Sequence, residues 1–102
     1  MDTARAAAIF KALGDENRVR IMQLLQEGEK CACKLLEEFD FSQPTLSHHM
    51  KILVEAELVH ARKVGKWMYY HISPDCIGEV LFFIMSLTPS HEHGEDCDCG
   101  CC

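Results

Sequence analysis

Cysteines are the residues of this sequence most able to do chemistry, and the chain of 102 residues has seven of them. Cys31 and Cys33 are separated by one alanine, and Cys76 stands alone. The other four lie near the C-terminal end: Cys97, Cys99, Cys101 and Cys102. An odd number of cysteines in three unlike settings does not suit a secreted disulfide scaffold. We therefore interpret them as reduced thiols, which bind soft ions or undergo redox chemistry.

Cys31 and Cys33 lie at the predicted start of a short helix. Its apolar residues recur at helical spacing: Ala32, Leu35, Leu36 and Phe39. Two positions along an ideal helix are about 200° apart, so both sulfurs cannot meet one ion. Binding an ion through both thiolates is therefore expected to distort the first turn. The alternative is a pair of small, inert hydrophobic residues, because free cysteine is commonly buried.

A polar face is predicted on a helix that runs from Ser42, a suitable N-cap, to about Ala56, with Pro44 in its first turn. Leu46, Met50 and Leu53 share one side of this helix. Polar side chains lie on the other side or near the N-terminal end: Gln43, Thr45, Ser47, His48 and Lys51. A recognition helix presents such short polar groups to base edges, and a lysine suits a phosphate. The alternative is an ordinary amphipathic helix with a solvated face.

A basic β-hairpin is predicted directly after this helix. Residues 59–64 and 67–72 are rich in β-branched and aromatic side chains and flank Gly65-Lys66, which suits a type II′ turn. Three cations lie around the turn: Arg62, Lys63 and Lys66. In a winged helix the tip of such a hairpin meets backbone phosphates. A hairpin tip that is merely solvated is the alternative.

Three further helices complete the predicted fold. The core-facing residues of the first two are Ala6, Phe10 and Leu13, and then Ile21, Leu24 and Leu25. Gly14 ends the first helix and Asp15 caps the second, while Pro74 opens a last helix that stops at Pro89. The expected order is α-α-α-α-β-β-α. This order predicts a mainly α fold with a β-hairpin wing, a winged helix-turn-helix.

Charge and composition favour one small DNA-binding domain, residues 1–89, with a tail at 90–102. The tail has no apolar periodicity, so we expect it to be a disordered segment rich in Cys and His. It contributes −4 to the net charge of −6, while residues 42–73 carry +2, a locally basic face compatible with DNA. No apolar run reaches the ~18 residues of a membrane span, and we expect residues 1–5 not to belong to a signal peptide, since they contain an early acid and no apolar segment. We expect a soluble, cytoplasmic protein without a membrane partner.

Four strings together resemble the ArsR/SmtB metalloregulatory repressors. They are residues 12–18 (ALGDENR), 31–35 (CACKL), 42–53 (SQPTLSHHMKIL) and 65–67 (GKW). The resemblance covers residues 8–73. It implies a homodimeric repressor that sits on operator DNA and leaves it when an inducer binds. Dimerisation in this family uses the first and last helices, which fits the widely apolar residues 77–87.

Cys31 and Cys33 resemble the cysteine pair of the arsenic-sensing branch, which implies As(III) or Sb(III) as the inducer. Trivalent arsenic and antimony prefer a pyramid of sulfurs. Leu36 stands where many arsenic-sensing relatives have a third cysteine. A third sulfur could then come from the tail, from Cys76 or from glutathione. The cadmium- and lead-sensing branch is disfavoured, since residues 1–30 contain no cysteine.

Other thiophilic ions and other functions stay open. Residues 75–79 lack the ligand pattern of the zinc-sensing branch, although His91, His93 and the tail thiols could bind zinc. The four tail cysteines are secondary candidates for an ion or a methylated arsenical, and His49, His60 and His71 are expected to be structural. A thiol redox sensor is the second hypothesis, and a thiol-rich metal carrier or small enzyme the third. No catalytic motif supports an enzyme.

Overall fold

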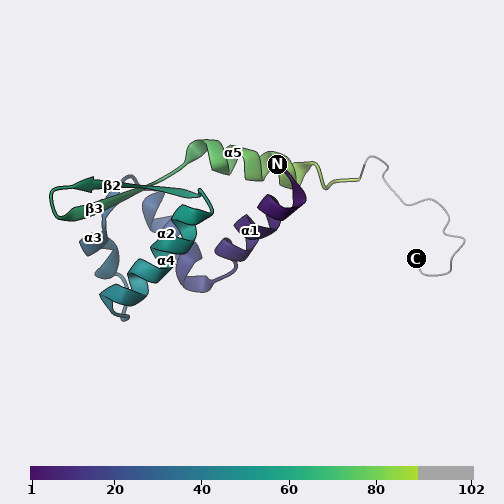
Figure 1. Cartoon of the computed structure of the whole chain (residues 1–102). Coiled ribbons are helices and arrows are strands. Elements are labelled where there is room, and N and C mark those ends of the chain that lie inside the picture. Colours follow the sequence, from purple (N-terminus) through teal and green to yellow (C-terminus); the bar gives the residue numbers. More distant parts are fainter. Residues whose placement is uncertain (90–102) are drawn as a thin grey trace, which may run out of the picture.

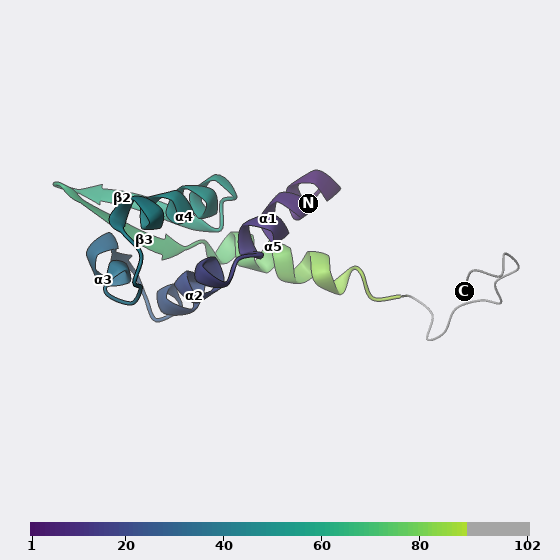
Figure 2. The ribbon, with the colours of Figure 1, turned by 90° about the horizontal axis from the view of Figure 1, so that it is seen from below.

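The computed structural model describes residues 1–89, so the predicted tail lies outside the described residues. Eight elements follow one another: α1 (Thr3–Leu13), α2 (Glu16–Leu25), β1 (Lys30–Cys31), α3 (Ala32–Leu36), α4 (Gln43–Glu55), β2 (Val59–Val64), β3 (Trp67–Ile72) and α5 (Pro74–Met85). The β2–β3 hairpin extends at one end, with α3 and α4 beside it, and α5 runs away from it to lie next to α1 (Figure 1). The view from below gives the same arrangement (Figure 2). The predicted mainly α fold with a hairpin wing is confirmed.

The hairpin has the predicted strands and turn. Val64 lies opposite Trp67 across the turn, and β2 and β3 pair antiparallel along their whole length. Gly65 has a φ of +61° whereas Lys66 does not have a positive φ, which is the pattern of a type II′ turn. This conformation suits the right-handed twist of the strands, so local residue choice determines the wing.

The structure has a short strand, β1, between α2 and α3, which the predicted element order lacks. The two residues Lys30 and Cys31 pair with the other edge of β3, opposite Tyr70 and Tyr69 respectively, so the sheet order is β1-β3-β2. Two residues are too few to show an alternating pattern. The strand exists because β3 offers its free edge to this segment.

The core lies between α1, α2, α4 and the sheet. Its fully buried large side chains are Ile9, Ile21, Leu35, Leu46, Met50, Leu53, Leu58 and Val59. The predicted inner face of α4 is confirmed, but the stripe on α1 is wrong at Phe10, which is 39% exposed. Ala6 is buried as predicted and Leu13 is half-buried, while Ile9 and Ala12 face the core in place of Phe10. Small alanines allow the helices to approach closely, while Phe10 turns toward Phe83 of α5, with ring centroids 6.0 Å apart.

Two helices end earlier than predicted. α3 stops at Leu36, and Phe39 lies in the connection to α4, where its ring stacks on Phe41 at 4.6 Å. α5 ends at Met85 rather than at Pro89, because the chain tightens into a turn in which the Thr88 hydroxyl donates to the Met85 carbonyl at 2.7 Å. Leu24 of α2, predicted to face the core, is only half-buried.

Candidate nucleic-acid interface and thiol site

The outer side of α4 carries the side chains predicted to read DNA. Ser47, His48 and Lys51 are exposed, and so is Gln43 at the first position of the helix. Thr45 is half-buried, and its hydroxyl lies 3.2 Å from that of Ser42, which makes no capping bond to the backbone. The apolar side of α4 is anchored in the core, so this polar side is held outward.

The inner side of α4 also makes a polar link to the start of α2. His49 is 8% exposed, and its Nδ1 lies 3.1 Å from the guanidinium of Arg18. Arg18 Nε donates to the carbonyl of Ala12 at 2.6 Å, and Asp15 accepts the backbone N–H of Arg18 at 3.1 Å. Burial lowers the pKa of His49, Arg18 and His48 lower it further, and Asp15 opposes the shift. A neutral His49 can accept a hydrogen bond from Arg18.

The wing cations divide into two groups. Lys63 near the end of β2 and Lys66 in the turn are both exposed, and Lys66 Nζ lies 5.9 Å from the ring centroid of Trp67. Arg62 instead makes a two-pronged ion pair with Glu29, with Nε 3.1 Å from Oε2. The hydrogen bond from Arg62 lowers the pKa of the Glu29 carboxyl. Glu29 was not predicted as a partner, because nothing in local spacing relates it to the wing.

Glu29 also lies beside one of the two strand histidines. His71 Nδ1 is 3.4 Å from Oε2 of Glu29, and the ring of His71 is 5.3 Å from that of His60 on the neighbouring strand. Glu29 therefore connects the segment before β1 to both strands of the wing. Within residues 1–89 no group of three or more His, Cys, Asp or Glu side chains is arranged to hold a metal ion.

A disulfide joins Cys31 and Cys33, whose Cα atoms are 5.4 Å apart. Cys31 is the last residue of β1 and the N-cap of α3, in an extended conformation with φ −79° and ψ 158°. The expectation that the two sulfurs point to opposite sides of a helix is therefore wrong, because only Cys33 is inside the helix. The sulfurs meet without any unwinding, so the pair can present two donors to one soft ion once it is reduced.

Within residues 1–89 no third cysteine is grouped with the pair. Cys76 is the other cysteine there, and it is 2% exposed in the first turn of α5. Burial raises the pKa of its thiol, although nearby Arg5 opposes the shift. Leu36, half-buried about one turn after Cys33, carries no donor atom. The tail candidates, Cys97, Cys99, Cys101 and Cys102, lie outside the described residues.

A small cavity adjoins Cys33 and links it to α4 and the hairpin. Its volume is about 150 Å³, and its lining comes from α3, the start of α4 and the wing: Ala32, Cys33, Leu36, Gln43, Lys66, Trp67 and Met68. Cys31 borders a different and more polar hollow, which includes Glu29 and Tyr69. Events at Cys33 therefore take place next to the first residue of α4 and the tip of the hairpin.

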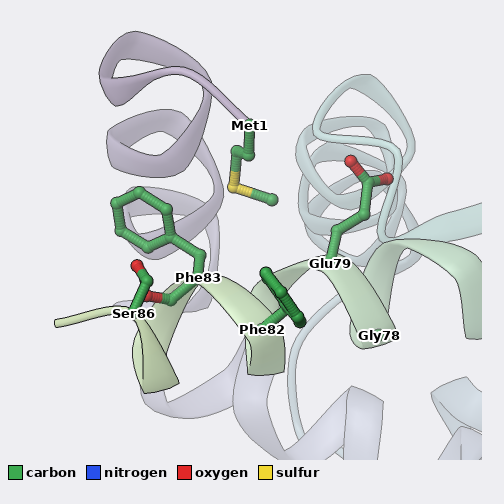
Figure 3. A pocket seen from close by; sticks show the side chains of 6 residues that line it. All are labelled: Met1, Gly78, Glu79, Phe82, Phe83 and Ser86. Carbon is green, nitrogen blue, oxygen red and sulfur yellow. The ribbon is translucent and has the colours of Figure 1, made fainter. Parts of the chain in front are cut away.

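The outer face of α5 is apolar and exposed in the single chain. Phe82 is 77% exposed, Leu81 59% and Met85 61%. Figure 3 shows Met1 above Phe82 and Phe83, which line a hollow of about 510 Å³ together with Gly78, Glu79 and Ser86. Large exposed apolar patches mark interaction surfaces. No helix within residues 1–89 is long and apolar enough to cross a membrane.

Comparison with known proteins shows sequence similarity to a family of bacterial regulators. A family model described as "Bacterial regulatory protein, arsR family" matches residues 15–61, from α2 into β2. The arsenical resistance operon repressor of Staphylococcus aureus is 42% identical over 92 residues, which are 90% of this chain and 88% of that protein. The chain belongs to the ArsR family. The predicted family resemblance is thereby confirmed.

Other ArsR-family relatives agree. An uncharacterised HTH-type transcriptional regulator of Methanocaldococcus jannaschii is 45% identical over 84 residues, covering 81% of this chain and 94% of that protein. The crystal structure of a possible transcriptional regulator for arsenical resistance superposes with a TM-score of 0.70 at 32% identity, over 74% of this chain and 79% of that one. This ArsR-family chain is a winged helix-turn-helix transcriptional regulator of the arsenical resistance repressor type, and not an enzyme.

Proposed function

We propose that this ArsR-family chain represses an arsenic-resistance operon and leaves its operator when As(III) or Sb(III) binds the thiolates of Cys31 and Cys33. The observation that carries the proposal is the adjacency of the two sulfurs at the junction of β1 and α3. A thiol reductant must first open the disulfide, since thiolates rather than disulfide sulfurs bind soft ions. Relatives named arsenical resistance operon repressors support the choice of inducer.

Release requires a physical path from the sulfurs to the DNA-facing residues. The cavity at Cys33 supplies one, because Gln43 of α4 and Lys66 of the wing line the same space. An ion on the sulfurs is expected to change the position of Cys33 and, through the shared cavity, the positions of Gln43 and Lys66. Moving an operator from mostly bound to mostly free takes a coupling of ~5 kcal/mol between the two sites.

The DNA contacts that we propose follow from exposure and charge. Base edges are read by the polar residues at the start and outer side of α4: Gln43, Thr45, Ser47 and His48. Phosphates are bound by the cations: Lys51, Arg62, Lys63 and Lys66. The assignment of Arg62 requires it to exchange its ion pair with Glu29 for a phosphate oxygen.

A homodimer completes the proposal. The exposed apolar face of α5, together with Phe10 of α1, is the surface that a second copy would cover. Two copies place two recognition helices on the DNA, so we expect a two-fold operator with half-sites roughly 34 Å apart, one helical turn.

The decisive experiment is release of the reduced protein from operator DNA, titrated with arsenite. Cys31→Ser and Cys33→Ser are expected to bind the operator normally and not to be released, because one local thiolate cannot chelate the ion. A matched control has all four tail cysteines replaced by serine and is expected to respond like the parent chain. Normal release of the Cys31→Ser/Cys33→Ser double variant would refute the site and would move it to the tail.

A second candidate function rests on the disulfide itself. Oxidation of Cys31 and Cys33 to the disulfide would release DNA, which makes the chain a redox sensor. Operator affinity measured for the oxidised and the reduced protein, without any arsenical, separates the two functions. Equal affinity of both forms excludes the redox sensor.

A further inference from the structure

A single buried histidine lies beneath the outer face of α4. His49 is 8% exposed on the inner side of this helix, while the preceding residue, His48, is exposed, and the two ring centroids are 6.0 Å apart. A helix moves as one element, so a shift that begins at His49 also moves the side chains on the outer face of α4. The polar contacts of His49 therefore bear on how α4 meets DNA.

Two groups of opposite charge lie beside the same nitrogen atom of His49. Nδ1 is 3.1 Å from a guanidinium nitrogen of Arg18 and 3.9 Å from Oδ2 of Asp15. A guanidinium can only donate hydrogen bonds, and a carboxylate can only accept them. Arg18 therefore binds Nδ1 when this atom carries no proton, and Asp15 attracts it when it does. The partner of this nitrogen depends on one proton.

The bond from Arg18 links α4 to two other helices. Arg18 lies in α2, and its Nε donates to the carbonyl of Ala12 at the end of α1 at 2.6 Å. A proton on Nδ1 of His49 removes the acceptor and places two cations 3.1 Å apart, where His49 is largely shielded from water. Protonation therefore separates Arg18 from α4.

The other groups that face His49 do not cancel this effect. Its charged or titratable neighbours are Asp15 and Arg18 at the start of α2 and His48 on α4 itself, and its remaining neighbour is the uncharged ring of Phe41 at 5.5 Å. Burial lowers the pKa of His49 and outweighs the opposing charge of Asp15. His49 is therefore neutral at pH 7 and takes up its proton in mild acid.

We propose that Arg18 and His49 are positioning residues for operator recognition: their hydrogen bond holds α4 in the orientation that reads base edges, and a proton on Nδ1 abolishes discrimination between DNA sequences. The proton comes from the solvent, adds to the lone pair of Nδ1 and breaks no covalent bond. Phosphate binding by Lys63 and Lys66 persists, because these cations lie on the wing. The inference rests on the proposed reading of base edges by α4 and does not depend on the thiol pair.

The experiment measures the affinity of the reduced full chain for operator DNA and for a scrambled duplex, from about pH 8 to about pH 5 at constant ionic strength. We expect a constant ratio of the two affinities above about pH 6.5. Below the folded pKa of His49, operator affinity is expected to fall about tenfold for each pH unit until it equals that of the scrambled duplex, because the fraction of chains with a neutral imidazole falls by this factor. The helical circular dichroism signal at each pH defines the range in which the chain is folded.

Two substitutions change the pH dependence in different ways. In His49→Asn, Oδ1 takes the place of Nδ1 and accepts from Arg18 at every pH, so discrimination is expected to become independent of pH. Asp15→Asn keeps an N-cap residue but removes the charge that favours the protonated imidazole, so the fall is expected to begin at a lower pH. A residue needed only for folding would not move the pH profile in these ways. Each variant is a separate test, so one that fails to fold leaves the other.

Two other histidines serve as controls. His60→Gln removes an exposed histidine of β2 and is expected to have the pH profile of the parent chain. His48→Gln removes the titratable neighbour on α4, and the fall in discrimination with pH is expected to persist, whatever the effect on the affinity itself.

The outcomes separate this inference from the proposed function. A parent chain that discriminates equally at every pH until it unfolds would overturn the inference, as would an equal fall in His49→Asn or an unchanged profile in Asp15→Asn. Gln43→Ala and Ser47→Ala are compared at about pH 7.5. If neither changes discrimination, α4 does not read base edges, so the proposed DNA contacts fail and the inference fails with them, while release by arsenite is tested independently.

Discussion

The guanidinium of Arg18 lies 3.1 Å from Nδ1 of His49 and ties the start of α2 to the buried side of α4. The same guanidinium holds the carbonyl of Ala12 at the end of α1. The orientation of α4 therefore depends on a polar junction of three helices in addition to its apolar contacts. The junction requires a neutral imidazole, because a protonated His49 has no acceptor to offer Arg18.

Stability is expected to fall in acid through His49. Burial lowers its pKa in the folded chain, so between the unfolded value of about 6.5 and the lower folded value the unfolded chain binds the additional proton. The stabilisation is complete above pH 6.5 and is lost as the pH falls toward the folded pKa. Urea unfolding of the parent chain and of His49→Gln, at several pH values and one protein concentration, measures this loss. His48→Gln is the exposed control; equal pH slopes for the parent and His49→Gln would contradict the prediction.

Glu29→Gln is expected to strengthen binding to DNA of any sequence. Loss of the carboxylate frees Arg62 for a phosphate, so the log–log salt dependence should steepen by about one unit. Glu27→Gln removes an exposed acid that pairs with Lys30 at 3.2 Å, and it serves as the control for net charge. Identical effects of the two variants would show that Arg62 stays away from the DNA.

Substitutions in the wing and in α4 are expected to change DNA binding in different ways. Lys66→Ala should weaken binding to all DNA sequences alike. It should also reduce the log–log slope of affinity against salt concentration by about one unit, since it removes a phosphate contact. Gln43→Ala or Ser47→Ala should instead relax sequence discrimination, by about 1–3 kcal/mol where a bidentate base contact is lost. Binding titrations with the operator and a scrambled duplex at several salt concentrations distinguish these effects. Altered sequence preference in Lys66→Ala would reverse the assignment.

Phe82→Glu is expected to yield a monomer. The substitution places a charge in the exposed apolar face of α5, where Phe82 is 77% exposed in the single chain. Sedimentation at micromolar concentration should show a dimer for the parent and a monomer for the variant, with much weaker operator binding. Val64→Glu, at an apolar residue 45% exposed on the wing, should remain dimeric. A monomeric parent chain that still binds the operator one-to-one would exclude the dimer.

The sequence by itself determined the elements whose signals are local. The strands of the hairpin and its type II′ turn were predictable because strand residues flank Gly65-Lys66 directly. The inner face of α4 followed from helical spacing, and Asp15 was recognisable as a cap because its side chain meets a backbone N–H three residues later. Each of these features depends on residues within one or two turns of chain.

Tertiary structure alone decided how these elements meet. Pairing with β3 holds Cys31 in an extended conformation opposite Tyr69 and outside α3, so the two sulfurs come together against the expectation from an ideal helix. Arg62 and Glu29 are 33 positions apart, and Arg18 and His49 are 31 apart. The cavity at Cys33 likewise needs three separate segments. Such contacts form only when packing of the core brings distant segments together, and no local periodicity of the sequence carries that information.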